Sequence, residues 1–453
     1  MKAIFFNRIH VHHRPYLYHG IIILKVQNHH HNKNDSDEKK KKVVQRLHCC
    51  VKKYEWGRAW RDSLVAKLFC MNSESQLEED EPYAELWMGT HVSGPSSIAL
   101  EGCERVTLKS WLLQNPNVLG EKVLEKWDGD LPFLFKVLSV DKALSIQAHP
   151  DKELAKNLHK LHPNIYKDEN HKPEMALAVT QFEALCGFVT LKVVLTVPEV
   201  LELVGAENVN LVLQITDEDG EEKVKPILKA TFIDIMSESK ERVIGVVNRL
   251  RSRLHKEMRQ LTVKEQLVKR LEKQYPSDVG VIAAFFLNHV KLSPSEALFL
   301  GPNEPHAYIY GECIECMATS DNVVRAGLTS KHRDAQTLCS MLTYKQGFPE
   351  ILGGVAINPY VNRYIPPFEE FEIDSCVLPQ GETVLFPAVL GPSIFLVIVG
   401  EGVMNTESPK GYQITEGDVL FVATNTKISV SSTSQLHLFR TGVNTRFFQT
   451  PRA

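Results

Sequence analysis

The segment Leu144–Lys152, which reads L-S-I-Q-A-H-P-D-K, is the strongest constraint on how this chain folds. Side chains alternate between the two faces of an extended strand, so its polar residues share one face: Ser145, Gln147 and His149. Pro150 then ends strand pairing, because proline has no N–H to donate. A Gln and a His opposite an apolar face are what a metal site on the inner wall of a β-barrel would require.

Two further candidate metal ligands lie downstream: Glu174 in N-H-K-P-E-M and His306 in N-E-P-H-A-Y. We therefore predict that one divalent metal is held by four side chains: Gln147, His149, Glu174 and His306. Nitrogen and oxygen donors of this kind are compatible with zinc. With a single carboxylate the cluster keeps about one unit of positive charge, which suits a Lewis acid that polarises substrate oxygens.

Four cations flank these ligands in the sequence: Lys136, Lys172, Arg325 and Lys331. Lys136 stands inside an apolar strand at residues 131–141, where a buried ammonium is costly unless it is paired or faces a polar cavity. The alternative is a lysine that extends to the surface, and we favour the cavity. Together the cations match a phosphate monoester, unless each pairs with a local carboxylate such as Asp321 or Glu315.

A chain of 453 residues is too long for one core, so two or three domains are expected. The formal charge of -3 gives no basic face for nucleic acid, and no apolar run approaches the roughly 20 residues of a membrane helix. The nine cysteines are scattered and follow no convincing secretory signal, which indicates reduced thiols in the cytoplasm.

Residues 1–47 differ in composition from the rest, with clustered histidines and the basic run Lys39–Lys42. A metal-binding tail or an organelle-targeting peptide would explain parts of this pattern. The first 34 residues carry no acidic side chain, as transit peptides prefer, but also no serine and only two arginines. We expect a disordered extension, because the apolar content is too low for packing.

The remaining chain is predicted to be mainly β with an inserted α domain. Residues 48–187 and 286–345 are expected to form a catalytic barrel, and 188–285 a helical insertion. One apolar stripe marks that insertion: Val243, Val247, Leu250, Leu254, Met258 and Leu261. Residues 346–453 show short strands and turns, which predict a second barrel without a catalytic cluster.

Two other motifs receive structural interpretations. His91 could be a metal ligand, but a complete ligand set exists without it, so we predict a hydrogen-bonded core or cleft histidine. Cys313 and Cys316 form a CxxC pair, but a zinc ribbon needs a second pair. In a strand, a spacing of three also sends the two thiols to opposite faces, so we expect both to be structural.

Seven segments of the chain resemble those of the type I mannose-6-phosphate isomerase family. They are Y-E-W-G, P-Y-A-E-L-W-M-G-T-H, F-L-F-K-V-L-S, L-S-I-Q-A-H-P-D-K, N-H-K-P-E-M, N-E-P-H-A-Y and S-D-N-V-V-R-A-G-L-T-S-K. The resemblance covers residues 48–450. Family members usually read Y-A-W-G, so Glu55 is a departure, which we expect to be harmless. The resemblance implies two cupin-type (jelly-roll) β-barrels plus a helical domain, and one Zn²⁺ per chain.

The resemblance also implies roles for individual residues. The family's zinc ligands match Gln147, His149, Glu174 and His306, and its active-site arginine matches Arg325. Its substrate pocket matches Ser145, Lys136, Tyr308, Asp321 and Lys331. Residues proposed for ring opening and proton transfer match His171 and Lys172.

The reaction implied is the interconversion of mannose 6-phosphate and fructose 6-phosphate through a cis-enediol, which feeds GDP-mannose and other mannose-derived sugar nucleotides. Its barrier is the deprotonation of carbon beside a carbonyl, which needs a base within reach of C2. Lys172, Glu315 and a water on the metal are candidates that the sequence does not rank. We expect a monomer.

Two other functions fit parts of the pattern. A cupin with two histidines and a carboxylate could bind iron and activate oxygen, and metal content with oxygen uptake would identify it. A sugar-phosphate sensor could keep the pocket without turnover. The ring of cations favours isomerisation over an iron-dependent oxygenase. The complete set of metal ligands together with Arg325 argues against a sensor without turnover.

Overall fold

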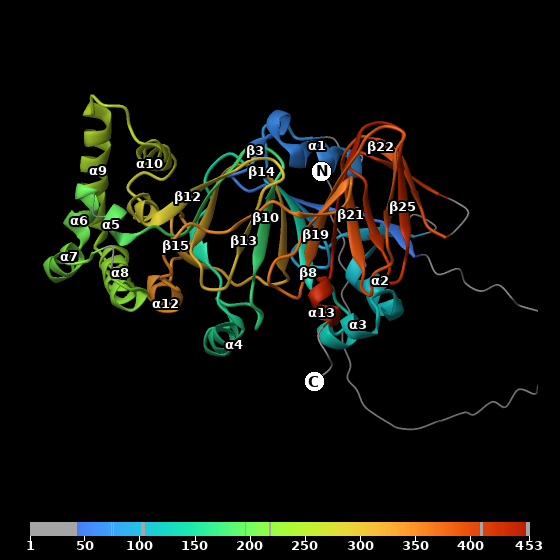
Figure 1. The fold of residues 1–453 in the computed structure, drawn as a ribbon, viewed down its shortest axis with the longest axis horizontal. Helices are drawn as coiled ribbons and strands as arrows, with labels where there is room; N and C mark the ends of the chain where they lie inside the picture. Colours follow the sequence, from blue (N-terminus) through green and yellow to red (C-terminus); the bar gives the residue numbers. More distant parts are fainter. Residues whose placement is uncertain are drawn as a thin grey trace, which may run out of the picture. The chain divides into compact units, whose positions relative to one another are not determined.

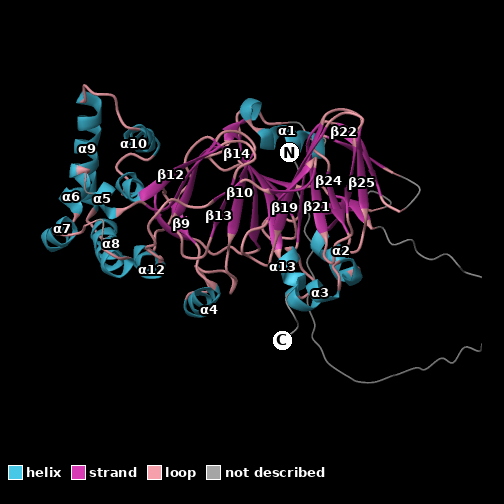
Figure 2. Ribbon diagram, viewed as in Figure 1, coloured by secondary structure: helices cyan, strands magenta, loops and turns pink. Residues whose placement is uncertain are grey.

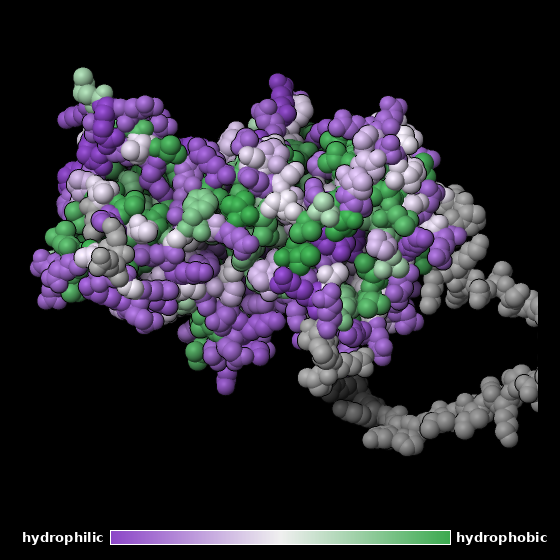
Figure 3. Space-filling view, viewed as in Figure 1, coloured by the Kyte–Doolittle hydropathy of each residue, from purple (hydrophilic) through white to green (hydrophobic). Residues whose placement is uncertain are grey.

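The structure is a computed structural model that describes residues 43–73, 75, 77–100, 105–194, 196–216, 219–407 and 411–449. In the sequence, strands dominate before and after a helical region, which confirms the prediction of a mainly β chain with helices between. The helices α5–α10 gather at one end of the molecule, at the left in Figures 1 and 2. No helix among the described residues is long and apolar enough to cross a membrane. On the face in Figure 3, hydrophilic residues cover most of the surface, with hydrophobic residues in small groups.

An eleven-stranded antiparallel sheet carries the predicted ligands. Its main path runs β16-β13-β10-β14-β8-β5-β2. Strands β9 and β11 also pair with β14, and they in turn pair with β15 and β12, respectively. The strands are β2 (Cys50–Lys52), β5 (Glu85–Met88), β8 (Phe133–Val140), β9 (Ile146–Ala148), β10 (Glu174–Ala178), β11 (Phe182–Phe188), β12 (Leu287–Leu292), β13 (Ala297–Leu300), β14 (His306–Ala318), β15 (Val324–Gly327) and β16 (Ile351–Leu352).

Strand β14 is the centre of this sheet. Its first residues, from His306 to Tyr310, pair with β9 and β11, whereas the residues from Gly311 on pair with β8 and β10. Gly311 has a φ of +112°, and a Cβ there would collide with the backbone of Gln181 and Phe182. A glycine at this position therefore lets one strand serve two sets of partners.

Between the end of β11 at Phe188 and the start of β12 at Leu287 the described chain is helical. The helices are α5 (Leu191–Val194), α6 (Pro198–Leu203), α7 (Ala206–Leu213), α8 (Glu221–Met236), α9 (Lys240–Lys256), α10 (Val263–Gln274), α11 (Gly280–Ala283) and η3 (Ala284–Phe286). Their core is shared with apolar residues of the sheet, including Ile146, Ala307 and Val324. The helices thus cover the part of the sheet that contains β9 and β15 (Figure 1).

The apolar stripe predicted for this region is partly confirmed. Four of its residues are buried on α9: Val243, Val247, Leu250 and Leu254. Met258 is 98% exposed, so the prediction is wrong there. The reason is that α9 ends at Lys256 and Glu257 is extended, before a capping box at Thr262 and Glu265 starts α10.

Two further sheets are built from residues 355–449, which we define as the C-terminal part, together with the N-terminal strand β1. Their orders are β1-β24-β21-β26-β19-β18-β17 and β20-β25-β22-β23, and they enclose a common apolar core. The strands are β1 (Val44–Arg46), β17 (Val355–Asn358), β18 (Val361–Tyr364), β19 (Glu372–Leu378), β20 (Thr383–Phe386), β21 (Ser393–Val399), β22 (Glu401–Asn405), β23 (Tyr412–Thr415), β24 (Val419–Val422), β25 (Ile428–Ser432) and β26 (Leu436–Gly442). The outer face of the larger sheet packs on β8 through residues such as Ile373, Phe439 and Phe135.

Strand β1 corrects the expected N-terminal boundary. It pairs with β24 from Val44 to Arg46, so residues 43–47 belong to the fold and not to the predicted extension. Residues 1–42 of that extension lie outside the described residues. Shorter elements complete the fold: β3 (Arg58–Ala59), β4 (Pro82–Tyr83), β6 (Ser97–Ala99), β7 (Arg105–Thr107), η1 (Trp60–Asp62), η2 (Pro116–Val118), α1 (Leu64–Ser73), α2 (Leu108–Gln114), α3 (Glu121–Trp127), α4 (Lys152–Leu161), α12 (Ala335–Met341) and α13 (Thr445–Gln449).

Candidate active site

A cavity of about 340 Å³ opens on the eleven-stranded sheet, and most of the predicted site residues line it. These predicted residues are Lys136, Ser145, Gln147, Lys172, Glu174, Tyr308, Glu315, Asp321, Arg325 and Lys331. They come from β8, β9, β10, β14 and β15 and from the loops beside them. Strand alternation explains this convergence, because every second residue of neighbouring strands faces the same side.

Three predicted metal ligands meet at the buried side of this cavity. His149, Glu174 and His306 each offer a ligand atom, and these atoms lie within 4.8 Å of one another. Glu174 is the first residue of β10, and His306 is the first of β14. Gln147 lies directly opposite His306 in the β9–β14 pairing and lines the cavity, so the fourth predicted ligand is next to the cluster.

The hydrogen bonds of the cluster fit a metal. His149 Nδ1 lies 2.7 Å from the carbonyl oxygen of Asn322, and His306 Nδ1 lies 3.0 Å from that of Glu304. Because a carbonyl only accepts, each Nδ1 carries the hydrogen and each Nε2 presents a lone pair. Among the described residues, neither these two Nε2 atoms nor Glu174 Oε2 has a hydrogen-bond partner, and all three atoms are buried. Two imidazole nitrogens and a carboxylate oxygen are a donor set that zinc accepts.

The protonation states of these groups agree with that reading. Burial lowers the pKa of His149 to about 4, so its imidazole is neutral near pH 7, as a metal ligand must be. Burial opposes ionisation of Glu174, but its histidine neighbours and the Lys172 ammonium hold its pKa well below the usual value. Lys172 Nζ lies 3.3 Å from Glu174 Oε1.

Lys136 faces the cavity, as predicted, and is also paired with carboxylates. Its Nζ lies 2.9 Å from Glu315 Oε2 and 3.5 Å from Glu85 Oε2, and the residue is 5% exposed. Burial alone would lower its pKa, but the two carboxylates raise it above the usual value, so the side chain is a cation. Burial raises the pKa of Glu315, and Lys136 opposes this rise.

Arg325 differs from these two lysines because no described residue is its counter-ion. Its guanidinium lines the cavity, and within the described residues it has neither an ion pair nor a hydrogen bond. Burial lowers its pKa, although a guanidinium stays charged in proteins. Its backbone pairs with that of Gln147, whose side-chain oxygen accepts a hydrogen bond of 3.3 Å from Ser145. A partly buried cation without a partner is ready for an anionic ligand.

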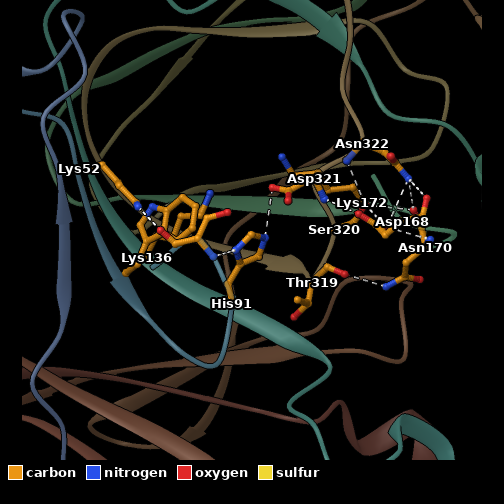
Figure 4. A network of polar contacts seen from close by, with 12 residues as sticks. Lys52, His91, Lys136, Asp168, Asn170, Lys172, Thr319, Ser320, Asp321 and Asn322 are labelled. Atoms are coloured by element: carbon orange, nitrogen blue, oxygen red, sulfur yellow. Dashed lines mark hydrogen bonds and ion pairs between the residues drawn. The ribbon is translucent and has the colours of Figure 1, made fainter. Parts of the chain in front are cut away.

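A polar network fixes the wall of the cavity at residues 319–322 (Figure 4). The Asp168 carboxylate accepts hydrogen bonds of 2.8 Å from both Ser320 Oγ and Asp321 N. Asn322, whose carbonyl orients His149, donates to the backbone of Asp168 at 2.7 Å. His91 lines the cavity 3.2 Å from Asp321 and is outside the metal group, which confirms it as a hydrogen-bonded cleft histidine.

Comparisons with known proteins agree with this geometry. The family model for the catalytic domain of type I phosphomannose isomerase matches residues 44–191, and that for the helical insertion domain matches residues 203–287. Mannose-6-phosphate isomerase 1 of Arabidopsis thaliana is 59% identical over 411 residues, which cover 89% of this chain and 95% of that protein. The Homo sapiens mannose-6-phosphate isomerase is 40% identical and covers 87% of this chain and 97% of its own length.

The chain belongs to the type I phosphomannose isomerase family. Solved structures of the family share its fold. A zinc-bound mannose 6-phosphate isomerase superposes with a TM-score of 0.73 at 27% identity, covering 89% of this chain and all of that one. A mutant phosphomannose isomerase from Salmonella typhimurium gives a TM-score of 0.74 at 26% identity, with the same coverage.

One residue that the family resemblance placed in catalysis lies elsewhere. His171 does not line the cavity in the part of the chain that the structure describes; its Nε2 lies 2.7 Å from Glu370 Oε1. This contact turns the ring toward the C-terminal part, although the next residue, Lys172, does line the cavity. The prediction of a catalytic role for His171 is therefore not supported by its position.

Sequence reasoning also missed residues that line the cavity, among them Tyr54, Glu85, Trp87 and Tyr275. Glu85 and Trp87 alternate on β5, and this spacing was a usable signal, because it places both on one face. Tyr275 follows α10 and reaches the cavity from the helical region. No local pattern could have assigned it to a site on the sheet.

The CxxC prediction is confirmed in one respect, since Cys313 and Cys316 lie in different apolar cores and are free.

Proposed function

We propose that this chain is a zinc-dependent isomerase that interconverts mannose 6-phosphate and fructose 6-phosphate. One observation supports this most directly. Two buried imidazoles and a carboxylate, whose ligand atoms have no hydrogen-bond partner among the described residues, lie beside a cavity lined by an arginine without an ion pair there. Gln147, His149, Glu174 and His306 would hold one Zn²⁺. The bound ion would supply a Lewis acid for the oxygens on C1 and C2 of the sugar.

The remaining chemistry falls to side chains of the cavity. Arg325 and Lys331 would hold the negative charge of the substrate, since both line the cavity. Ser145, Tyr308 and Asp321 offer hydrogen-bonding groups that orient the hydroxyls.

The proton transfer needs a base near C2, and we infer that this base is Glu315. It is 3% exposed, it lines the cavity, and burial raises its pKa. Its carboxylate would accept the proton from C2 and return it to C1, while the hydroxyl proton of O2 moves to O1, so that the enediol becomes the ketose. Lys136, paired with Glu315, would keep the carboxylate ionised before transfer. Lys172 lies against Glu174, so it is less free to act as the base.

The finer architecture is also part of this proposal. We infer that residues 48–187 and 286–345 form a cupin-type catalytic barrel, that 188–285 is the inserted helical domain, and that 346–453 is a second barrel of the same type without metal. The antiparallel sheets and the family relationship support this division. We further propose a cytoplasmic monomer, supported for the compartment by eight free cysteines among the described residues.

A coupled assay tests the function. Fructose 6-phosphate formation from mannose 6-phosphate is measured before chelation, after chelation and after Zn²⁺ is restored. We expect activity to disappear and return. An iron-dependent oxygenase would instead show bound iron and oxygen uptake, and a sensor would bind the sugar phosphate without turnover. Either result would overturn the proposal.

A further inference from the structure

Glu370, in the loop before β19, reaches from the C-terminal part to two segments that adjoin metal ligands in the sequence. Its Oε1 lies 2.7 Å from His171 Nε2 and 3.4 Å from Lys152 Nζ. Lys152 follows the ligand His149 by three residues, and His171 precedes the ligand Glu174 by three. One carboxylate therefore contacts the two segments that carry these ligands.

We infer that Glu370 is a positioning residue that sets the separation of His149 and Glu174 and so tunes the affinity of the metal site. The inference rests on the zinc site of the proposed function. Groups outside the ligand set that orient ligands commonly change metal affinity by about 10–100-fold when they are removed. The C-terminal part, none of whose described residues belongs to the metal group, then contributes to the site through this contact.

The contact is buried and strongly polar. Glu370 is 3% exposed and His171 is 8% exposed, so water does not screen their hydrogen bond. Burial opposes ionisation of Glu370, but the bond to His171 and the charge of Lys152 bring its pKa down to about 2. The carboxylate is therefore ionised near pH 7 and accepts the hydrogen of His171 Nε2, which makes this a charge-assisted bond.

The loop that presents Glu370 is held firmly in place. The side-chain amide of the buried Asn444 donates to the carbonyls of Pro366, Phe368 and Phe371, at 3.1, 2.7 and 3.1 Å. Phe368 also packs on Phe299 of β13, with ring centroids 6.1 Å apart. Because β13 pairs with β10, the loop is fixed relative to the strand that begins with Glu174. A fixed loop can transmit position, whereas a loose one could not.

A purely structural contact would affect stability alone, so the test reads metal affinity directly. Zn²⁺ affinity of the full chain is measured by competition with a chromophoric chelator, without substrate, for the wild type, Glu370→Gln and Glu370→Ala. His171→Gln tests the same contact from the other side. Glu369→Gln is the matched control, because it removes the neighbouring carboxylate, for which the described residues show no ion pair.

We expect Glu370→Ala and His171→Gln to weaken Zn²⁺ binding by about 10–100-fold, Glu370→Gln to lie between them and the wild type, and Glu369→Gln to match the wild type. With excess Zn²⁺, kcat should recover while KM stays unchanged, which a general loss of folding would not produce. Affinities within about twofold of the wild type for Glu370→Gln and His171→Gln would overturn the inference. A chain that binds Zn²⁺ tightly but does not isomerise would overturn only the proposed function.

Discussion

The substitution Lys136→Met should destabilise the protein strongly, because it removes the only cation within 4 Å of two buried carboxylates in the described structure. Lys136, Glu85 and Glu315 are 5%, 7% and 3% exposed. The ammonium lies 2.9 Å from Glu315 and 3.5 Å from Glu85. Methionine fills a similar volume but leaves both carboxylates without a counter-ion. Breaking a buried ion pair from one side typically costs about 3–5 kcal/mol, which is a large share of a usual folding free energy of about 5–15 kcal/mol.

The stability lost in Lys136→Met should depend on pH, and the direction of this dependence follows from the pKa of Glu315. Burial and neighbouring carboxylates already raise the pKa of Glu315, and without Lys136 this rise is larger. A carboxyl whose folded pKa exceeds its unfolded value binds more protons in the folded state. The free energy of unfolding therefore decreases as pH rises from the unfolded-state pKa to the folded-state pKa. The decrease is at most about 1.4 kcal/mol per pH unit for one group. The deficit of the variant should be smaller at mildly acidic than at mildly alkaline pH.

Urea unfolding of wild type and variant at both pH values measures this difference directly. Lys142→Met is the matched control: Lys142 pairs at 3.3 Å with Glu55, whose side chain is 74% exposed, so its loss should cost about 0–1 kcal/mol at either pH. A Lys136→Met protein that unfolds like this control, with no dependence on pH, would refute the account of a buried, doubly paired ammonium.

Four further substitutions test the roles assigned at the site. His306→Ala and Gln147→Ala should each lose bound zinc, and retention of stoichiometric metal by atomic emission would refute the ligand assignment. Arg325→Ala should keep its zinc while turnover falls by about 100–1000-fold, and unchanged turnover would remove this residue from the catalytic set. Glu315→Gln should lower kcat by about 100-fold or more. In the wild type, activity should fall as acid protonates Glu315 below its raised pKa, and a variant that keeps this acidic limb would exclude Glu315 as the base.

Much of the site could be predicted because it obeys strand alternation. Gln147 lines the cavity from β9 and Ser145 from the residue just before it, and a lysine inside an apolar strand, Lys136, does so from β8. His306 and Glu174 are 132 residues apart in the sequence, but each begins a strand, and β10 and β14 are neighbours. Polar residues that interrupt apolar strands are thus informative about function wherever burial would otherwise be costly.

The parts that escaped prediction depend on how separate elements dock. Tyr275 and Glu370 act on the site from the helical region and the C-terminal part, and neither stands in a pattern that marks its destination. His171 sits beside a cavity residue, so its direction could not be read from its neighbours. Met258 continued a helical spacing, yet its helix had already ended. Periodicity describes an element while it lasts but does not show where it stops.

The balance of charge in the cavity explains why a metal and a phosphorylated sugar belong together here. Among the described lining residues, five are acidic and four are basic: Glu55, Glu85, Glu174, Glu315 and Asp321 against Lys136, Lys172, Arg325 and Lys331. The protein alone therefore carries a formal charge of about -1, which opposes a phosphate monoester of about -2. A divalent ion brings the formal charge to about +1. Two of the lysines are already matched by Glu315 and Glu174, so attraction for the phosphate depends on the ion together with Arg325 and Lys331. Metal and substrate should then strengthen each other's binding, because each compensates the charge that opposes the other.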